Sequence, residues 1–163
     1  MRHFIAIFVC LTVLLAASLA LGQTKVKFTT TPTFGSTVKD GIHASPPALA
    51  LGLKLQTKNF GGWSYSIETG ASSPYANTIL SPFVTPGIQY AFSTRWHLGT
   101  NISLKYADPG RGDRYFNLGA TMILGVAISP GIGIGFGLGI GTPLNGPTGG
   151  IGLSFGPKFS FTL

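Results

Sequence analysis

Glu68 is the first candidate for a functional side chain, because the 163-residue chain has only four acidic residues against 11 lysines and arginines. Its segment alternates strictly, so a carboxylate on the inner face of a sheet would need a cationic partner. We expect an ion pair with Arg95 or Lys54 within an internal structural network. The alternative is a gate, or an anion-preferring lining around a narrow path. The candidate lining residues share one alternation parity: Lys54, Glu68, Arg95, His97, Lys105 and Lys158.

His97 raises the question of catalysis, since a histidine beside a serine such as Ser103 and the Glu68 carboxylate would form a triad. These are common residues without a motif around them, and we predict that the protein is not an enzyme. The glycine-rich segments alternate as G-x-G-x-G, which lacks the spacing of a nucleotide-binding loop. The histidines are far apart and the single cysteine is Cys10, so we predict neither a metal site nor a cofactor.

Arg111, Gly112 and Asp113 follow a Pro-Gly pair in a predicted loop. On an exposed loop this tripeptide could present its two charges to a host integrin, and the protein would then be an adhesin. The same residues are ordinary turn formers. We therefore interpret them as loop and keep adhesion as a lower-ranked alternative.

Eight alternating segments must position these side chains. Successive residues of a strand point to opposite faces, and the charged residues in these segments fall on the face without large apolar side chains. The apolar period is two rather than 3.6, so no helix is predicted after the leader. The predicted strands are 24–34, 47–57, 62–69, 79–92, 95–107, 115–129, 132–142 and 150–163.

The connections between these segments alternate in length. Longer ones cover 35–46, 70–78, 108–114 and 143–149, whereas tight ones cover 58–61, 93–94 and 130–131. Short turns on one rim and long loops on the other are typical of a membrane barrel with both termini at the periplasmic side. Aromatic residues near both predicted rims suggest two interfacial girdles: Trp63, Phe92 and Trp96 at one, Tyr106 and Phe116 at the other.

Residues 1–22 have the features of a secretory signal peptide, with a basic start, an apolar stretch and small residues before cleavage after Ala20 or, preferably, Gly22. The alternative, a membrane anchor, is disfavoured because the apolar stretch is short and lacks a flanking charge on its far side. Residues 23–163 would form one domain without cysteine, and hence without disulfides. The formal net charge of +7 is scattered along the chain, so we predict no nucleic-acid binding.

Composition and alternation together favour a membrane barrel. Only 9% of the residues are charged, against about 25% in soluble domains. A sheet in hydrocarbon must close to pair its backbone groups, and eight strands is the smallest common closure. We predict an all-β, eight-stranded antiparallel up-and-down transmembrane β-barrel after a cleaved signal peptide. The alternative is a secreted, glycine-rich soluble barrel, lipocalin-like with its apolar face inside, or a self-assembling β-protein.

The glycines on the inner face have two interpretations that the sequence leaves open. They could allow strong curvature and close approach by large groups from other strands. They could equally line a cavity that holds water or a ligand.

In pattern, the whole mature chain resembles the small eight-stranded outer-membrane barrels of Gram-negative bacteria, such as the OmpA membrane domain, OmpX and OmpW-like proteins. Its apolar residues alternate up to the terminus at Phe159, Phe161 and Leu163, as in the C-terminal assembly signal of that family, although an aromatic is commoner than leucine at the last position. The resemblance implies an outer-membrane location, contacts with outer-membrane lipid and lipopolysaccharide, and insertion by the barrel-assembly machinery through the C-terminal strand.

The same resemblance implies a non-catalytic protein with a structural role or a role in passing or holding small solutes, and we expect a monomer. Some barrels of this kind modify lipid A, and the deacylases among them carry a late His-x-Ser-Asn motif. Here His43-Ala44-Ser45 comes early, in a predicted loop, and is followed by Pro46. A lipid-A-modifying enzyme is therefore only a lower-ranked alternative.

Overall fold

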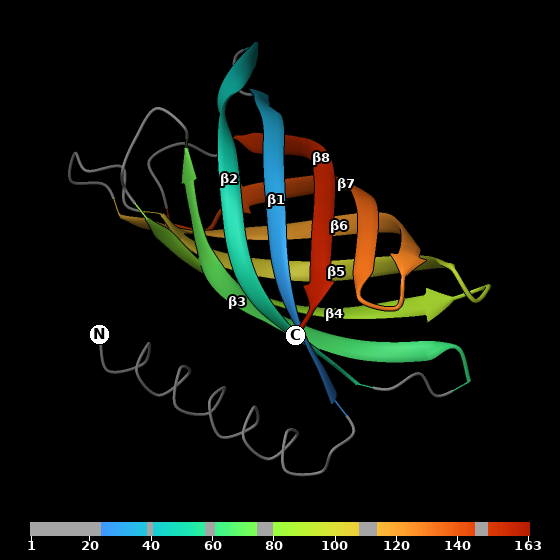
Figure 1. Ribbon diagram of the computed structural model, residues 1–163. Coiled ribbons are helices and arrows are strands. Elements are labelled where there is room, and N and C mark those ends of the chain that lie inside the picture. Colours follow the sequence, from blue (N-terminus) through green and yellow to red (C-terminus); the bar gives the residue numbers. More distant parts are fainter. Residues whose placement is uncertain (1–23, 39–40, 58–60, 75–79, 108–113, 146–149) are drawn as a thin grey trace.

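The fold is a closed barrel of eight antiparallel strands (Figure 1). The computed structural model describes residues 24–38, 41–57, 61–74, 80–107, 114–145 and 150–163. Each strand pairs with the next along the chain, and the last pairs with the first. The predicted fold class is thereby confirmed, while the predicted signal peptide lies outside the described residues. The strands are β1 (Thr24–Val38), β2 (Ile42–Thr57), β3 (Trp63–Pro74), β4 (Ser81–Ala91), β5 (Trp96–Ala107), β6 (Tyr115–Ser129), β7 (Ile132–Pro143) and β8 (Ile151–Thr162).

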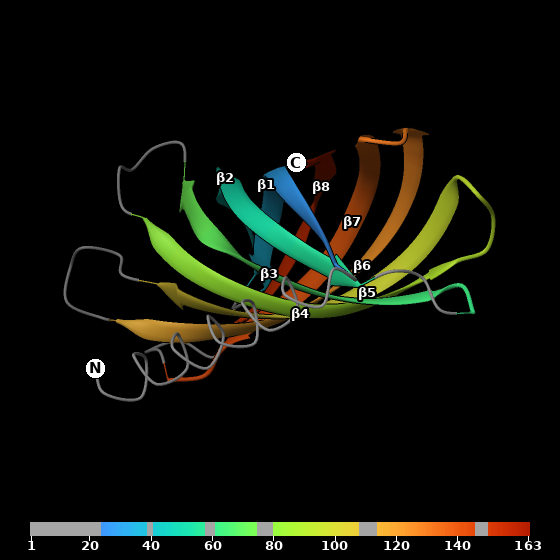
Figure 2. The ribbon, with the colours of Figure 1, turned by 60° about the horizontal axis from the view of Figure 1, so that its bottom comes forward.

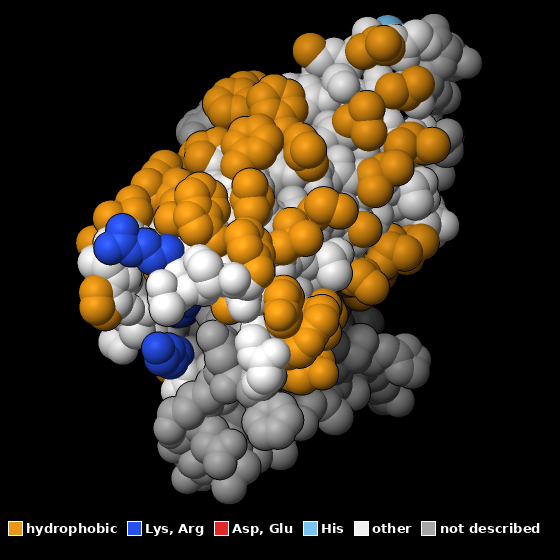
Figure 3. Space-filling model, turned by 90° about the vertical axis from the view of Figure 1, so that its right-hand side faces the viewer, with side chains coloured by type: hydrophobic (Ala, Val, Ile, Leu, Met, Phe, Trp, Pro, Cys, Tyr) orange, Lys and Arg blue, Asp and Glu red, His pale blue; other side chains and the backbone are white. Residues whose placement is uncertain are grey.

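The two faces of the sheet have opposite chemistry, and the apolar face is on the outside. Large apolar side chains such as Leu53, Met122 and Phe136 are exposed there. Figure 3 shows hydrophobic side chains over much of one face of the barrel, with Lys and Arg side chains at one edge of that face. The interior is polar instead. Among the described residues, the buried polar side chains are Thr29, Gln56, Ser64, Glu68, Ser72, Ser81, Thr85 and Asn101, whereas Leu55 is the one apolar side chain buried to that degree. This distribution contradicts a soluble barrel with an apolar lumen.

Aromatic pairs lie towards both ends of the barrel. The rings of Trp63 and Tyr90 lie 4.8 Å apart near the short turns, and those of Tyr106 and Phe116 lie 5.4 Å apart at the opposite end. Such pairs are expected where a barrel crosses the two interfaces of a membrane. No helix in the described part of the chain is long and apolar enough to span a membrane.

The strand boundaries differ most from the prediction in the first three strands. The predicted long connection at 35–46 is wrong, because β1 continues to Val38 and β2 begins at Ile42. The two strands stay paired there beyond an irregularity between Thr33 and Gly35. Glycine, serine and proline hide the apolar alternation in this stretch, although the backbone ladder continues. His43 therefore lies in a strand rather than a loop, and β3 extends to Pro74 instead of ending at residue 69.

The turns after β2, β4 and β6 define what we call the short-turn end of the barrel, and its described residues are 61–62, 92–95 and 130–131. The chain also ends here, where the Leu163 amide donates to the carbonyl of Val26, 3.0 Å away. Figures 1 and 2 show the C-terminus beside the first part of β1. The first and last strands thus close the barrel at the same end as its tight turns.

The closing seam between β1 and β8 is interrupted at its centre. Residues 27–30 pair with 159–162, and 34–38 pair with 151–155. Pro32 and Pro157 lie in the gap, and neither has an amide hydrogen to donate to the ladder. Gly156 is buried at this point, where a β-carbon would overlap the carbonyl oxygen of Pro32. A glycine therefore lets the two strands approach where the ladder is weakest.

We expect Gly156→Ala to lower the free energy of unfolding by about 2 kcal/mol, since the added methyl meets backbone that must shift. Gly152→Ala is the matched control, because its methyl would be 3.6 Å from the nearest atom, the carbonyl oxygen of Gly141. The control should change stability by no more than about 0.5 kcal/mol. Urea unfolding of the refolded barrels measures both. Equal effects of the two variants would contradict this account of the seam.

Candidate functional site: a basic cavity in the lumen

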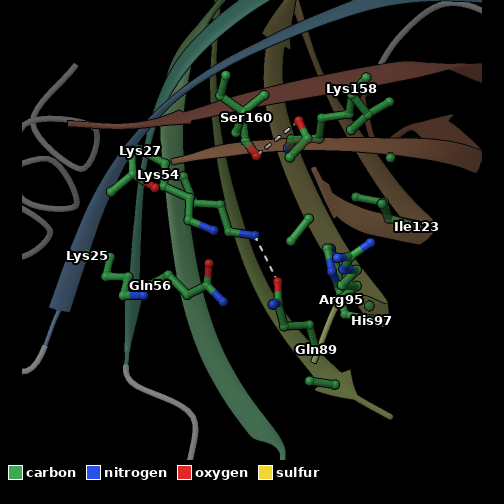
Figure 4. A pocket seen from close by; sticks show the side chains of 18 of the residues that line it. Lys25, Lys27, Lys54, Gln56, Gln89, Arg95, His97, Ile123, Lys158 and Ser160 are labelled. Atoms are coloured by element: carbon green, nitrogen blue, oxygen red, sulfur yellow. Dashed lines mark hydrogen bonds between the residues drawn. The ribbon is translucent and has the colours of Figure 1, made fainter. Parts of the chain in front are cut away.

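A cavity of about 440 Å³ occupies the lumen at the short-turn end. Its lining comes from strands on several sides of the barrel and from the turns at 93–95 and 130–131. In Figure 4 the side chains of Lys25, Lys27 and Lys54 lie on one side, with Arg95 and His97 on the other. The volume lies within the range of about 300–1,000 Å³ found for small-molecule pockets.

The lining of this cavity is strongly basic. Five of its residues are cationic, namely Lys25, Lys27, Lys54, Arg95 and Lys158, and no acidic side chain is among the lining residues. Lys27 and Lys54 are direct partners in the register of β1 and β2. Like charges placed opposite each other in a sheet repel. The cavity therefore concentrates positive charge at one end of the lumen.

Glu68 lies buried behind this lining and accepts hydrogen bonds through both carboxylate oxygens. Oε2 forms an ion pair with the ammonium of Lys158, and Oε1 accepts from the Thr29 hydroxyl at 2.7 Å. The three side chains come from β3, β8 and β1, and β3 is adjacent to neither of the other two strands, so the network joins parts of the lumen wall that the sheet does not pair. Gly52 lies between Thr29 and Glu68, and a β-carbon there would be 3.1 Å from an oxygen of each. The glycine thus keeps this contact open.

The predicted ion pair of Glu68 exists with a different partner. Lys158 replaces the expected Arg95 or Lys54. Lys54 is the register neighbour of Glu68, but its ammonium donates to the Gln89 side-chain oxygen at 3.3 Å. Arg95 lies in the turn between β4 and β5, which Ser93 shapes by accepting from the backbone amides of Arg95 and Trp96 at 3.2 and 2.9 Å. That turn keeps Arg95 exposed at the mouth of the cavity.

His97 lies over a glycine on the adjacent strand, β6. Its register partner is Gly125, and a β-carbon on Gly125 would overlap the imidazole ring. Gly87 and Asn101 repeat the arrangement, because a β-carbon on Gly87 would overlap the Asn101 side-chain oxygen. The inner glycines therefore make room for larger side chains from neighbouring strands.

Other inner glycines bound the cavity directly: Gly99, Gly131, Gly133 and Gly135 are among its lining residues. Both interpretations of these glycines from the sequence, close approach and an open cavity, thus describe parts of the same lumen.

The structure brings together most of the predicted lining residues. Lys54, Arg95, His97 and Lys158 line the cavity, whereas Lys105 lies towards the opposite end of β5. Lys25 and Lys27 complete the cavity, although the site prediction omitted them. Their alternation parity marks them as inward-facing, and only the register of β1 against β2 shows that Lys27 lies opposite Lys54 and Lys25 opposite Gln56.

The catalytic triad considered for His97, Ser103 and Glu68 is not formed in the structure. Glu68 bonds to Lys158 and Thr29, and no hydrogen bond among the described residues joins His97 to Glu68 or Ser103. Within the same residues, no group of three or more histidine, cysteine or acidic side chains could hold a metal ion.

Two further sequence motifs, the Arg-Gly-Asp tripeptide and the C-terminal pattern, differ in whether the structure describes them. The loop residues Arg111, Gly112 and Asp113 lie outside the described residues. Phe161 and Leu163 are exposed on the outer side of the barrel, and Phe159, two residues earlier on the same strand face, is half-buried. These three residues keep the parity that the proposed assembly signal requires, and their recognition by an assembly machinery stays a prediction.

Comparison with known proteins identifies the fold. No family model matches the sequence, and no curated protein sequence matches it either. Among solved structures, the barrel is similar to Neisserial surface protein A, with a TM-score of 0.54 and 12% identity over 85% of this chain and 97% of that one. It is also similar to Ail, the attachment invasion locus protein of Yersinia pestis, with a TM-score of 0.50 and 13% identity over 85% and 99%. The fold resemblance predicted from the sequence is thereby confirmed.

Proposed function

We propose that the protein is an integral outer-membrane barrel with no catalytic role, whose lumen holds a small solute at the short-turn end. One observation carries the membrane assignment, namely an apolar outer face around a polar interior. A closed sheet has no free edge strand, so its strands can pair their backbone groups on both sides, as hydrocarbon requires. The strands have 11 to 16 residues, enough to cross a bilayer core when tilted.

Orientation and partners follow from this proposal. The turns after β2, β4 and β6 and the C-terminus share one end, which in such barrels faces the periplasm. The apolar outer face would contact outer-membrane lipid and lipopolysaccharide, and export would depend on the predicted signal peptide. The C-terminal strand would be the segment that the barrel-assembly machinery recognises.

Holding a solute is favoured over catalysis and over free passage. The cavity has a volume suited to a small ligand and polar side chains that converge on it. The network of Glu68, Lys158 and Thr29 lies across the lumen beside it. Such a network supports a lumen that is open at the short-turn end and obstructed further in, and it is compatible with the gate interpretation of Glu68.

The membrane assignment is tested by extracting the protein from outer-membrane fractions with mild detergent and running it on SDS gels with and without boiling. We expect a mobility shift on boiling together with a β-rich circular dichroism spectrum, because a closed barrel resists SDS until heated. Recovery of the protein in the soluble fraction without detergent, with no shift, would reject the proposal. Gly152→Ala serves as a folded control, since its methyl meets only ordinary contacts.

A further inference from the structure

We infer that the basic cavity binds a small oxyanion that carries two or more phosphate or carboxylate groups. This inference specifies the ligand class for the solute-holding lumen proposed above. The first reason is charge: five cationic residues line a space with no acidic side chain in its lining. Glu68, the one acidic side chain in the described residues, is already bonded to Lys158 and Thr29.

The second reason is the electrostatic repulsion between neighbouring lysines when no ligand is bound. Lys27 and Lys54 are register partners on adjacent strands and face the same lumen. Their repulsion opposes pairing of β1 with β2 unless an anion lies between them. The Lys54 ammonium donates to a neutral amide oxygen, that of Gln89 at 3.3 Å. A bound oxyanion would give these ammonium groups charge-assisted hydrogen bonds.

The third reason is that the lysine side chains point into the lumen. A lysine at the edge of a barrel can extend its chain towards lipid headgroups. Lys27 and Lys54 instead have the inward parity, and Figure 4 shows them in the cavity with Arg95 across from them. A headgroup anchored in a surrounding bilayer would not reach this space, whereas a free solute entering from the short-turn end would.

The fourth reason is the set of neutral groups around the cations. Gln56, Gln89, Asn101 and Ser160 line the same cavity and offer amide and hydroxyl hydrogen bonds. The Ser160 hydroxyl donates weakly to the carbonyl of Gly133, at 3.4 Å, and could exchange this contact for an anionic oxygen. Four cations remain after Lys158 is paired with Glu68, so a ligand with several negative charges matches the site better than a single chloride.

The test is calorimetric titration of the refolded barrel with pyrophosphate, in a non-ionic detergent at low ionic strength. We expect binding at one site per barrel, with Lys27→Gln and Lys54→Gln each weakening it about tenfold. Lys105→Gln is the matched control, because it removes an equal charge from an inward-facing lysine outside the cavity. It should change the affinity by less than about twofold.

Two further measurements keep the inference falsifiable if a variant refolds poorly. Lys54→Arg retains the charge and should retain binding within about threefold. Pyrophosphate should also raise the unfolding midpoint of the native sequence, since it binds only the folded barrel. Absence of binding to a barrel that shows the gel shift would overturn the inference, as would an equal loss of affinity in Lys105→Gln. Because the titration needs a closed barrel but no membrane, it can fail while the outer-membrane assignment holds, and the reverse is equally true.

Discussion

Replacing Glu68 with alanine is expected to lower the free energy of unfolding by about 3 kcal/mol, because removing one partner of a buried ion pair leaves the other charge uncompensated. The side chains of Glu68 and Lys158 are only 7% and 14% exposed. The substitution also removes the acceptor of the Thr29 hydroxyl. Lys54, the register neighbour of Glu68, would lose the only nearby carboxylate in the described structure. Urea unfolding of the refolded barrel measures the loss.

A double variant separates the ion pair from simple loss of packing. Glu68→Ala combined with Lys158→Ala removes both charges, and we expect it to recover about 2 kcal/mol relative to the sum of the single variants. Lys105→Ala is the control for loss of an inward-facing lysine and should stay within about 0.5 kcal/mol of the native sequence. If Glu68→Ala costs less than 1 kcal/mol, the network is not a structural element of the lumen.

The alternation of the sequence was sufficient to predict the barrel and the direction of its charged side chains. In β2, the leucines at 51 and 53 are exposed, whereas Lys54 and Gln56 face inward. A period of two assigns each residue to a face whatever the partner strand is. That is why Lys54, Arg95, His97 and Lys158 could be assigned to one surface before any pairing was known.

The contacts within the lumen could not be predicted in the same way. Glu68 and Lys158 belong to β3 and β8, which are separated by two strands around the barrel. Their distance depends on the register of three successive pairings and on the closure of the sheet. None of these is encoded in the spacing of either residue. Lys54 is the register neighbour of Glu68, but its ammonium donates to the side-chain oxygen of Gln89 on β4 instead.

The extent of β1 and β2 was missed for a different reason. Burial of one face imposes alternation only where that face meets an apolar phase. Residues 35–38 and 42–45 continue the hydrogen-bonded ladder beyond that region, so their side chains follow no strict pattern. Val38 still pairs with Ile42 and with Ile151 of β8. The sheet therefore extends past the segment that the sequence pattern can mark.

Met122→Arg is expected to lower the free energy of unfolding by about 3 kcal/mol in phospholipid vesicles, because it places a charge on the lipid face near the middle of β6. Ile128→Arg makes a similar change near the short-turn end of the same strand and should cost less than about 1 kcal/mol. The two native side chains are 59% and 58% exposed, so exposure alone predicts equal effects. The costs of the two variants should differ only if the medium around the barrel changes with depth, as a bilayer does.

The comparison therefore tests the membrane itself rather than the barrel. If the outer face met water, an arginine at either position would be a surface substitution worth no more than about 0.5 kcal/mol. Equilibrium unfolding from vesicles measures both variants against the native sequence. Similar costs at the two depths would mean that hydrocarbon does not surround β6, and the apolar outer face would then need a different partner. A large cost at Met122 alone would place the centre of β6 at the bilayer midplane.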